Sequence, residues 1–99
     1  MRRGTTPTHT FALPFETSII SALRITYKQE NNVIITKDKN DCTLNGNVIN
    51  VKLSQEETLK FKCNSPAKVQ LRIVKNDEAI ASEVFNFFVN ECLDNEVIK

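Results

Sequence analysis

The stretch Asp41-Cys42-Thr43-Leu44-Asn45-Gly46-Asn47-Val48-Ile49-Asn50-Val51-Lys52-Leu53 decides the fold of this chain. Its Asn45-Gly46 step lies between two runs of alternating apolar and polar residues, and both residues tolerate the positive φ of a type I′ turn. A two-residue loop at this step places Cys42 and Leu44 on the same face as Ile49, Val51 and Leu53. The stretch therefore predicts a β-hairpin with one buried face.

The same alternation predicts further strands on both sides of the hairpin, over residues 9–13, 19–27, 33–36, 59–63, 69–73 and 79–89. In the stretch 19–27, the expected inward face carries Ile19, Ser21, Leu23, Ile25 and Tyr27. In the last stretch the parity slips, and one extra residue near Val84 would restore it, which predicts a β-bulge. Ser54-Gln55-Glu56-Glu57 has the form of a capping box but is too short for a stable free helix. A single helical turn crossing between two sheets is expected there.

Together these signals predict an all-β fold of about seven strands with one short helical turn, as a β-sandwich or small barrel. The 99 residues suffice for one domain with a modest core. The sandwich is expected over residues 9–91, between a flexible N-terminal arm at 1–8 and a C-terminal tail at 92–99.

Composition limits the partners that the chain is expected to have. With 40% hydrophobic and 25% charged residues it has the make-up of an ordinary soluble domain. A formal charge of +1 offers no basic face, so no nucleic-acid partner is expected. No apolar run approaches the ~20 residues of a membrane helix. No hydrophobic stretch follows Arg2 and Arg3 as in a signal peptide, so no membrane partner is predicted and synthesis is expected to be cytoplasmic.

Candidate catalytic residues are few. His9 is the single histidine and hence the natural suspect for acid–base or nucleophilic catalysis, but no carboxylate lies near it in sequence, so a structural role is favoured. Glu56 and Glu57 are adjacent and diverge in a strand or turn. Gly4 and Gly46 are the only glycines, so there is no phosphate-binding loop. No catalytic residue and no cofactor site is predicted, and the chain is expected not to be an enzyme.

Three cysteines, Cys42, Cys63 and Cys92, raise the question of a disulfide or a metal site. Their odd number and wide spacing are unlike a secreted disulfide framework. With His9 they could form a Cys₃His zinc site, but zinc ligands usually come in close pairs and no two of these cysteines lie within twenty residues. Packing as small hydrophobes is the favoured interpretation, and no metal site is predicted. A zinc-dependent or cysteine enzyme remains a third hypothesis, which a metal assay would decide.

The aromatic cluster Phe85-Asn86-Phe87-Phe88 is expected to belong mainly to the core. Phe88 falls on the face opposite Phe85 and Phe87. If Phe88 is exposed, it would indicate a contact surface instead.

The segment Leu53-Ser54-Gln55-Glu56-Glu57-Thr58-Leu59-Lys60-Phe61-Lys62-Cys63 resembles the E-to-F crossover of immunoglobulin variable domains. In those domains a Leu, three residues including an acid, and Asp-Thr precede Tyr-x-Cys. Here Phe61 replaces the tyrosine, residues 19–27 contain no cysteine to pair with Cys63, and the chain has no tryptophan. The resemblance implies a Greek-key fold, and with the strand signals it leads us to expect an all-β, immunoglobulin-like antiparallel β-sandwich of about seven strands with one short helical turn.

A second resemblance spans nearly the whole chain. The opening Met1-Arg2-Arg3-Gly4-Thr5-Thr6-Pro7-Thr8-His9, the Leu13-Pro14-Phe15 turn and the stretch 53–58 are similar to small uncharacterised proteins of phages and prophages of Gram-positive gut bacteria. More faintly, the chain resembles the N-terminal sandwich of phage baseplate upper proteins. This resemblance implies a virion-associated or assembly role.

Two functions are therefore expected ahead of an enzyme. The first is a non-enzymatic structural or protein-interaction module of a phage virion, in the tail or baseplate, acting through sheet edges and terminal arms. It implies a protein partner or self-association, and incorporation into a virion after cytoplasmic synthesis. The alternative is a ligand-binding sandwich that recognises host surface glycans, for which Tyr27 and the absence of Trp provide little stacking surface.

Overall fold

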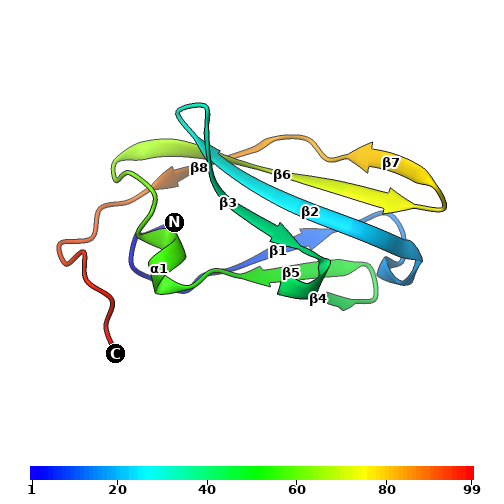
Figure 1. The fold of residues 1–99 in the computed structure, drawn as a ribbon, viewed down its shortest axis with the longest axis horizontal. Helices are drawn as coiled ribbons and strands as arrows, with labels where there is room; N and C mark the ends of the chain where they lie inside the picture. Colours follow the sequence, from blue (N-terminus) through cyan, green and yellow to red (C-terminus); the bar gives the residue numbers. More distant parts are fainter.

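The computed structural model describes all 99 residues, which form two antiparallel β-sheets packed face to face (Figure 1). The small sheet has the strand order β1-β5-β4, with β1 at Thr8–Ala12, β5 at Val48–Lys52 and β4 at Cys42–Asn45. The large sheet contains β3 at Asn32–Asp38, β2 at Ile20–Gln29, β6 at Ser65–Lys75, β7 at Glu78–Ala81 and β8 at Phe85–Val89. Its order is β3-β2-β6, and both β7 and β8 pair with β6. The predicted all-β sandwich is confirmed.

Three short helices join the strands: η1 at Thr17–Ile19, η2 at Lys39–Asp41 and α1 at Gln55–Thr58. The capping box predicted for α1 is present. Ser54 Oγ accepts a hydrogen bond from the Glu57 backbone N–H at 3.1 Å, and Glu57 Oε1 accepts one from the Ser54 N–H at 2.9 Å. As expected, this single turn carries the chain from β5 in the small sheet to β6 in the large sheet.

The strand order is that of the immunoglobulin sandwich without its first strand. Strands β1, β5 and β4 take the places of B, E and D; β3, β2 and β6 take those of C′, C and F; and β7 with β8 takes that of G. The segment Leu53–Cys63 is the E-to-F crossover that its sequence resembles. Because strand A has no counterpart, β1 is an edge strand.

The Asn45-Gly46 hairpin forms one residue later than predicted. Asn45 pairs with Val48, so the loop is Gly46-Asn47. Within this loop, Gly46 has a positive φ of 59° and Asn47 does not. This is the pattern of a type II′ turn and not of type I′. The predicted faces are nevertheless right, with Ile49 and Val51 fully buried, because the shift moves each partner by two residues and side chains alternate with period two.

Two other hairpins have the backbone of type I′ turns. Glu30 and Asn31 join β2 to β3 with φ of 53° and 66°, and Asn76 and Asp77 join β6 to β7 with φ of 48° and 61°. Positive φ at both loop residues defines this turn type. Polar residues that tolerate positive φ thus close these hairpins without any glycine.

The strand expected at residues 59–63 is not formed. The N–H groups of Leu59, Lys60 and Phe61 donate to carbonyls of residues 55, 57 and 58, so α1 and the turn after it use the groups that a ladder would need. Phe61 is a core residue at 1% exposure, whereas Cys63 is exposed. The alternating pattern at 59–63 therefore reflects the burial of Phe61 from a loop, and not a strand.

The single bulged strand expected at 79–89 is two strands. Residues 82–84 pair with no neighbouring strand as a ladder, and β7 and β8 lie on either side of them. Ser82 pairs the backbone groups of Leu71 on β6 at this point. Its N–H donates to Leu71 O at 2.8 Å, and its hydroxyl accepts from the Leu71 N–H at 3.0 Å. The parity slip seen in the sequence is therefore an interruption larger than one bulged residue.

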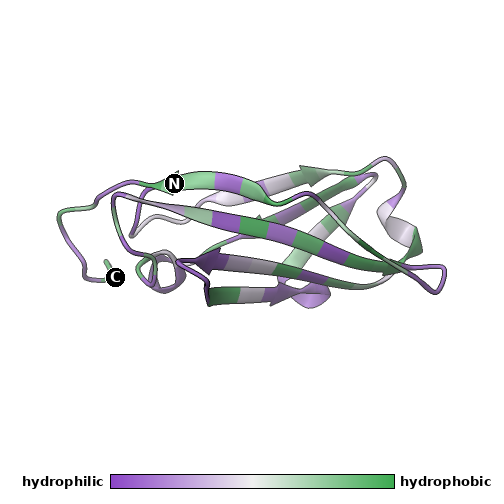
Figure 2. Ribbon diagram, turned by 90° about the horizontal axis from the view of Figure 1, so that it is seen from above, coloured by the Kyte–Doolittle hydropathy of each residue, from purple (hydrophilic) through white to green (hydrophobic).

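The core lies between the two sheets, and apolar and polar residues alternate along the strands that enclose it (Figure 2). From Leu23 onward the inward face predicted for 19–27 is right. At its start the prediction is wrong, since Ile20 is buried and Ile19 is exposed. The register between β2 and β6 shifts between Ile20 and Ala22, and this shift changes the face.

Both termini and α1 lie at the same end of the sandwich (Figure 1). The segment Met1–Arg3, part of the expected N-terminal arm, runs parallel to the end of β8. The Met1 amino group donates to Phe88 O at 2.7 Å, and Asn90 N–H donates to Met1 O at 2.6 Å. In the tail, Gln55 exchanges two hydrogen bonds with the backbone of Ile98. None of the helices is long and apolar enough to cross a bilayer.

Candidate functional site

His9, the suspected catalytic residue, lies on β1 with its ring directed into the sandwich. Its Nδ1 and the Tyr27 hydroxyl share a hydrogen bond of 2.6 Å, with donor and acceptor set by the imidazole tautomer. Its ring also packs 5.9 Å from the ring of Phe87. Burial, followed by the charge of the N-terminus, lowers the pKa of His9 below its usual value of 6.5. No carboxylate reaches this ring by hydrogen bond or ion pair.

Tyr27, the hydrogen-bond partner of His9, is fully buried. Burial raises its pKa, and the nearby Cys42 and Glu57 raise it further. Its ring meets Phe61 and Phe87 edge-on at 6.2 Å in both cases. A neutral phenol hydrogen-bonded to a neutral imidazole satisfies two buried polar groups, which is a packing role.

The three cysteines remain far from a common site. All three thiols are free, and no group of three His, Cys, Asp or Glu side chains lies close enough to hold a metal ion. Cys42 donates to Asp38 O at 3.3 Å, and Cys92 donates to Asp94 O at 3.3 Å. Burial first, then the charges of Asp41 and Asp38, raise the pKa of Cys42 and so disfavour its thiolate.

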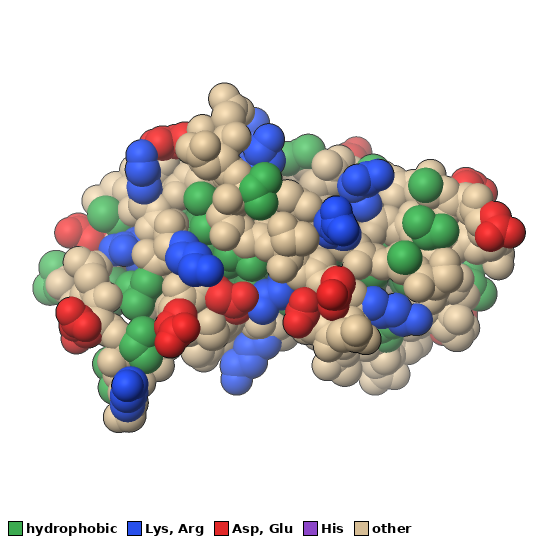
Figure 3. All heavy atoms as spheres, in the orientation of Figure 1, with side chains coloured by type: hydrophobic (Ala, Val, Ile, Leu, Met, Phe, Trp, Pro, Cys, Tyr) green, Lys and Arg blue, Asp and Glu red, His purple; other side chains and the backbone are tan.

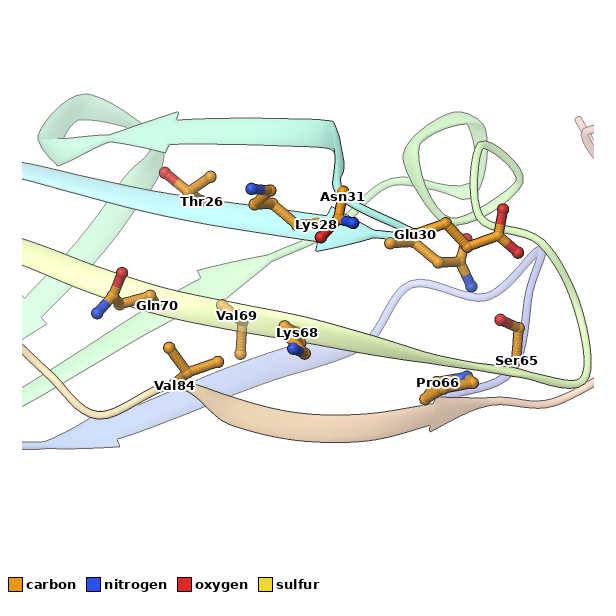
Figure 4. A pocket seen from close by; sticks show the side chains of 11 residues that line it. Thr26, Lys28, Glu30, Asn31, Ser65, Pro66, Lys68, Val69, Gln70 and Val84 are labelled. Carbon is orange, nitrogen blue, oxygen red and sulfur yellow. The ribbon is translucent and has the colours of Figure 1, made fainter.

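A hollow that carries charged groups lies on the outer face of the large sheet, and we call it the outer-face hollow. It measures about 580 Å³ and extends from β2 and its hairpin to the start of β6 and the residue before β8 (Figure 4). Its side-chain hydrogen-bonding groups come from Thr26, Asn31, Ser65 and Gln70, with Lys28, Glu30 and Lys68 as charged groups and Pro66 and Val84 as apolar ones.

Two like-charge pairs cross this outer face. Arg24 lies directly opposite Arg72, and Lys28 lies directly opposite Lys68, on the paired strands β2 and β6. We call these the cationic rows. The two ion pairs of the molecule, Lys37–Glu57 and Lys62–Glu30, involve none of these four side chains. Like charges directly opposite one another in a sheet are destabilising, so the rows carry a cost that the fold itself does not require.

A second candidate lies where strand A is missing. The Leu13 N–H donates to Asn47 O and the Leu53 N–H to Pro7 O, so the odd-numbered residues of this segment bond to β5. In an antiparallel pair, the intervening residues direct their N–H and C=O groups to the other side. The backbone groups of Thr8, Thr10 and Ala12 therefore form an unpaired edge.

Beside this edge the interior of the sandwich is open. A hollow of about 200 Å³ is lined by Thr10, Phe11, Ala12, Leu13, Leu71, Ser82 and Phe85. Phe85 is on the inward face of β8 and its ring lies 6.0 Å from that of Phe11, yet it is 45% exposed. Val84 beside it is 47% exposed. We call the β1 edge together with residues 82–85 the seam.

The expected aromatic cluster thus divides in three. Phe87 packs against the core, Phe85 is half open at the seam, and Phe88 is 49% exposed on the outer face. The exposure of Phe88 meets the condition under which the sequence indicated a contact surface. On the side of the molecule seen in Figure 3, by contrast, acidic and basic side chains are mixed.

Sequence reasoning missed both surfaces. The sequence shows that Arg24 and Lys28 share one face of a strand, and that Lys68 and Arg72 share one face of another. It does not show the register that places the two pairs opposite one another. The seam had no sequence signal beyond the uncharged composition of β1 and β8.

The fold and these surfaces define a small immunoglobulin-like β-sandwich that lacks its first strand. Searches against models of known families, against curated proteins and against solved structures return no match for this chain.

Proposed function

We propose that this chain is a non-enzymatic structural module that associates with a second copy of itself through the seam. The observation that carries the proposal is Phe85, an inward-facing aromatic side chain left 45% exposed beside an unpaired strand edge. Free edges recruit further strands, and exposed apolar side chains beside them add burial to the backbone hydrogen bonds.

A two-fold pairing of the β1 edges suits the side chains. With Thr10 opposite its symmetry mate, Thr8 lies opposite Ala12 on the outer face of the small sheet and His9 lies opposite Phe11 on the inner face, so no facing residue carries a formal charge. No residue of β1, β4 or β8 carries a formal charge, whereas β3 contains Lys37 and Asp38 and β7 contains Glu78. Of the two uncharged edges of the small sheet, β1 is the one beside Phe85. Charged side chains are a common protection of edge strands, and β1 has none. An isologous contact of this kind closes after two copies.

The test is light scattering coupled to size-exclusion chromatography over a range of protein concentrations. Wild-type protein should reach twice its monomer mass of 11.3 kDa. Thr10→Lys places two like charges at the two-fold axis and should weaken the dimer by about tenfold or more, equivalent to about 1.4 kcal/mol. Thr43→Lys, on β4 of the same sheet, is the matched control and should leave the dimer unchanged.

Two results would overturn the proposed dimer. One is a wild-type monomer at millimolar concentration, and the other is an equal effect of Thr10→Lys and Thr43→Lys. Circular dichroism of both variants separates a lost contact from a lost fold.

The setting that we propose is a phage particle, as a tail or baseplate component assembled after cytoplasmic synthesis. Support comes from the resemblance of Met1–His9 and of residues 53–58 to small phage and prophage proteins. Detection of the chain in purified particles by mass spectrometry would support this setting. Its presence only in the lysate from which the particles were removed would contradict it.

A further inference from the structure

The cationic rows and the outer-face hollow lie together on the outer face of the large sheet, and the hollow meets the seam only at Val84. Arg24 and Arg72 form one row, Lys28 and Lys68 the other, and Thr26 lies opposite Gln70 between them. At about 3.3 Å per residue, the two rows are about 13 Å apart. A ligand that spans both rows must therefore be extended.

The acidic groups near the rows are too few to neutralise them. Asp38 lies opposite Arg24 on the β3 side but forms no ion pair with it. Glu30, at the rim of the hollow, pairs with Lys62 at 2.6 Å and is neutralised there. The strip that remains is cationic although the whole chain has a formal charge of only +1.

The hollow between the lysines is lined mostly by neutral groups that donate and accept hydrogen bonds. Thr26 and Ser65 supply hydroxyls, Asn31 supplies an amide, and Gln70 supplies its amide oxygen, because its amide nitrogen donates to Ser82 O at 2.9 Å. Its volume of about 580 Å³ is within the usual range for ligand sites. No aromatic ring lines the hollow itself, and the exposed Phe88 of β8 lies at its border, opposite Pro66. The hollow therefore lacks the row of stacked rings on which successive nucleic-acid bases bind.

From this arrangement we infer that the outer face binds an acidic polysaccharide, with its carboxylates at the cationic rows and its hydroxyls in the hollow. The charge of the rows is complementary to the polymer, and binding would relieve the repulsion between Lys28 and Lys68. The inference assigns a surface to the alternative function, glycan recognition. The recognised sugars would be charged and held by the cationic rows, and not neutral sugars stacked on aromatic rings. It is independent of the proposed dimer, which uses the seam.

The probe is polygalacturonate, used in affinity electrophoresis and in thermal unfolding, with neutral dextran as the comparison polymer. Polygalacturonate should retard the wild-type protein and raise its Tm, dextran should do neither, and the effect should decrease with added salt. The double variant Lys28→Gln with Lys68→Gln should weaken binding by about tenfold, equivalent to about 1.4 kcal/mol. It should fold at least as stably as wild type, because it removes a like-charge pair.

The matched control is Lys52→Gln with Lys60→Gln, which changes the net charge equally at exposed lysines outside the hollow. This control should keep wild-type affinity. Equal losses in the two double variants would overturn the site in favour of an unspecific charge effect. Tighter binding of oligo-dT than of polygalacturonate would overturn the ligand class, and no binding of either polymer would overturn the inference.

Discussion

At the scale of single residues, individual buried side chains each pair two backbone groups of another segment. Thr58 donates to Thr5 O at 2.9 Å and accepts from the Gly4 N–H at 3.0 Å, which ties the N-terminal segment to α1. The Gln29 amide donates to Lys62 O at 2.9 Å and accepts from the Lys62 N–H at 2.6 Å. These side chains form the hydrogen bonds that strand pairing provides in the sheets. Such bonds matter because a buried backbone N–H or C=O without a partner destabilises the fold.

His9 gives the first pH prediction at this scale. Its folded pKa is lowered from 6.5, mainly by burial, so the unfolded chain binds the proton more readily. The stabilising effect of this pairing is complete above pH 6.5 and is lost as pH falls from there through the lowered pKa of the folded state. Urea unfolding should therefore give a lower free energy at pH 5.5 than at pH 7.5.

His9→Gln should flatten that difference, whereas Tyr27→Phe should keep it and cost about 1 kcal/mol at both pH values through the lost hydrogen bond. An NMR titration that placed the pKa of His9 above 6.5 would contradict the argument.

At the scale of elements, α1 depends on a carboxylate with two tasks. Burial pushes the pKa of Glu57 up, but hydrogen bonds from Lys37 and Ser54, together with the Lys37 charge, outweigh it and lower that pKa below 4.5. The Lys37 ammonium lies 2.7 Å from Glu57 Oε2 and 2.9 Å from Oε1, and the same carboxylate caps α1. One side chain therefore joins the crossover helix to the large sheet.

The second pH prediction follows from this carboxylate. A lowered carboxyl pKa contributes stability above pH 4.5 that is lost as pH falls through the folded value. Glu57→Gln should lower Tm at pH 7 and should reduce the further loss of stability between pH 5 and pH 3. Glu56→Gln, the exposed neighbour without an ion pair, should leave both unchanged. Equal acid sensitivity of wild type and Glu57→Gln would contradict this role.

Elements also show where local sequence was sufficient and where it was not. The capping box forms as predicted because all its bonds lie within four residues. The stretch 59–63 has the alternation of a strand, but the N–H groups of residues 59–61 donate to carbonyls of α1, and the Lys62 N–H donates to the Gln29 side chain. None of these groups is left for pairing with a strand. The stretch 79–89 shows a parity slip, but the hydrogen bond that Leu71 N–H donates to the Ser82 hydroxyl, at the point where the strand is interrupted, joins residues eleven apart in the chain and is not visible in the local pattern.

At the scale of the whole molecule, two candidate surfaces lie on different parts of one sandwich. The seam runs along β1 and the β7–β8 interruption, and the cationic rows lie on the outer face of β2 and β6. They share Val84 but no cationic residue. Mutations of the lysines of the rows, or of Thr10 on β1, should therefore leave the other surface intact, as is usual for residues without shared partners.

The whole-molecule prediction is that Thr10→Lys keeps wild-type retardation by polygalacturonate. Conversely, Lys28→Gln with Lys68→Gln should keep the wild-type dimer mass. Paired chromatography and affinity electrophoresis on the same preparations measure both. If either variant altered both properties, the two surfaces would be coupled, and a separate use for each would be untenable.

The sequence by itself determined the alternation of the strands, the faces of the 42–53 hairpin and the capped turn between the sheets. These features depend on side-chain period and on bonds between near neighbours, which short stretches of residues contain. Only the tertiary structure decided that β1 is left without a neighbour, that Phe85 is half exposed beside it, and that Lys28 faces Lys68. Each of these depends on the register between strands far apart in the chain, because pairing places residues side by side that no local pattern relates.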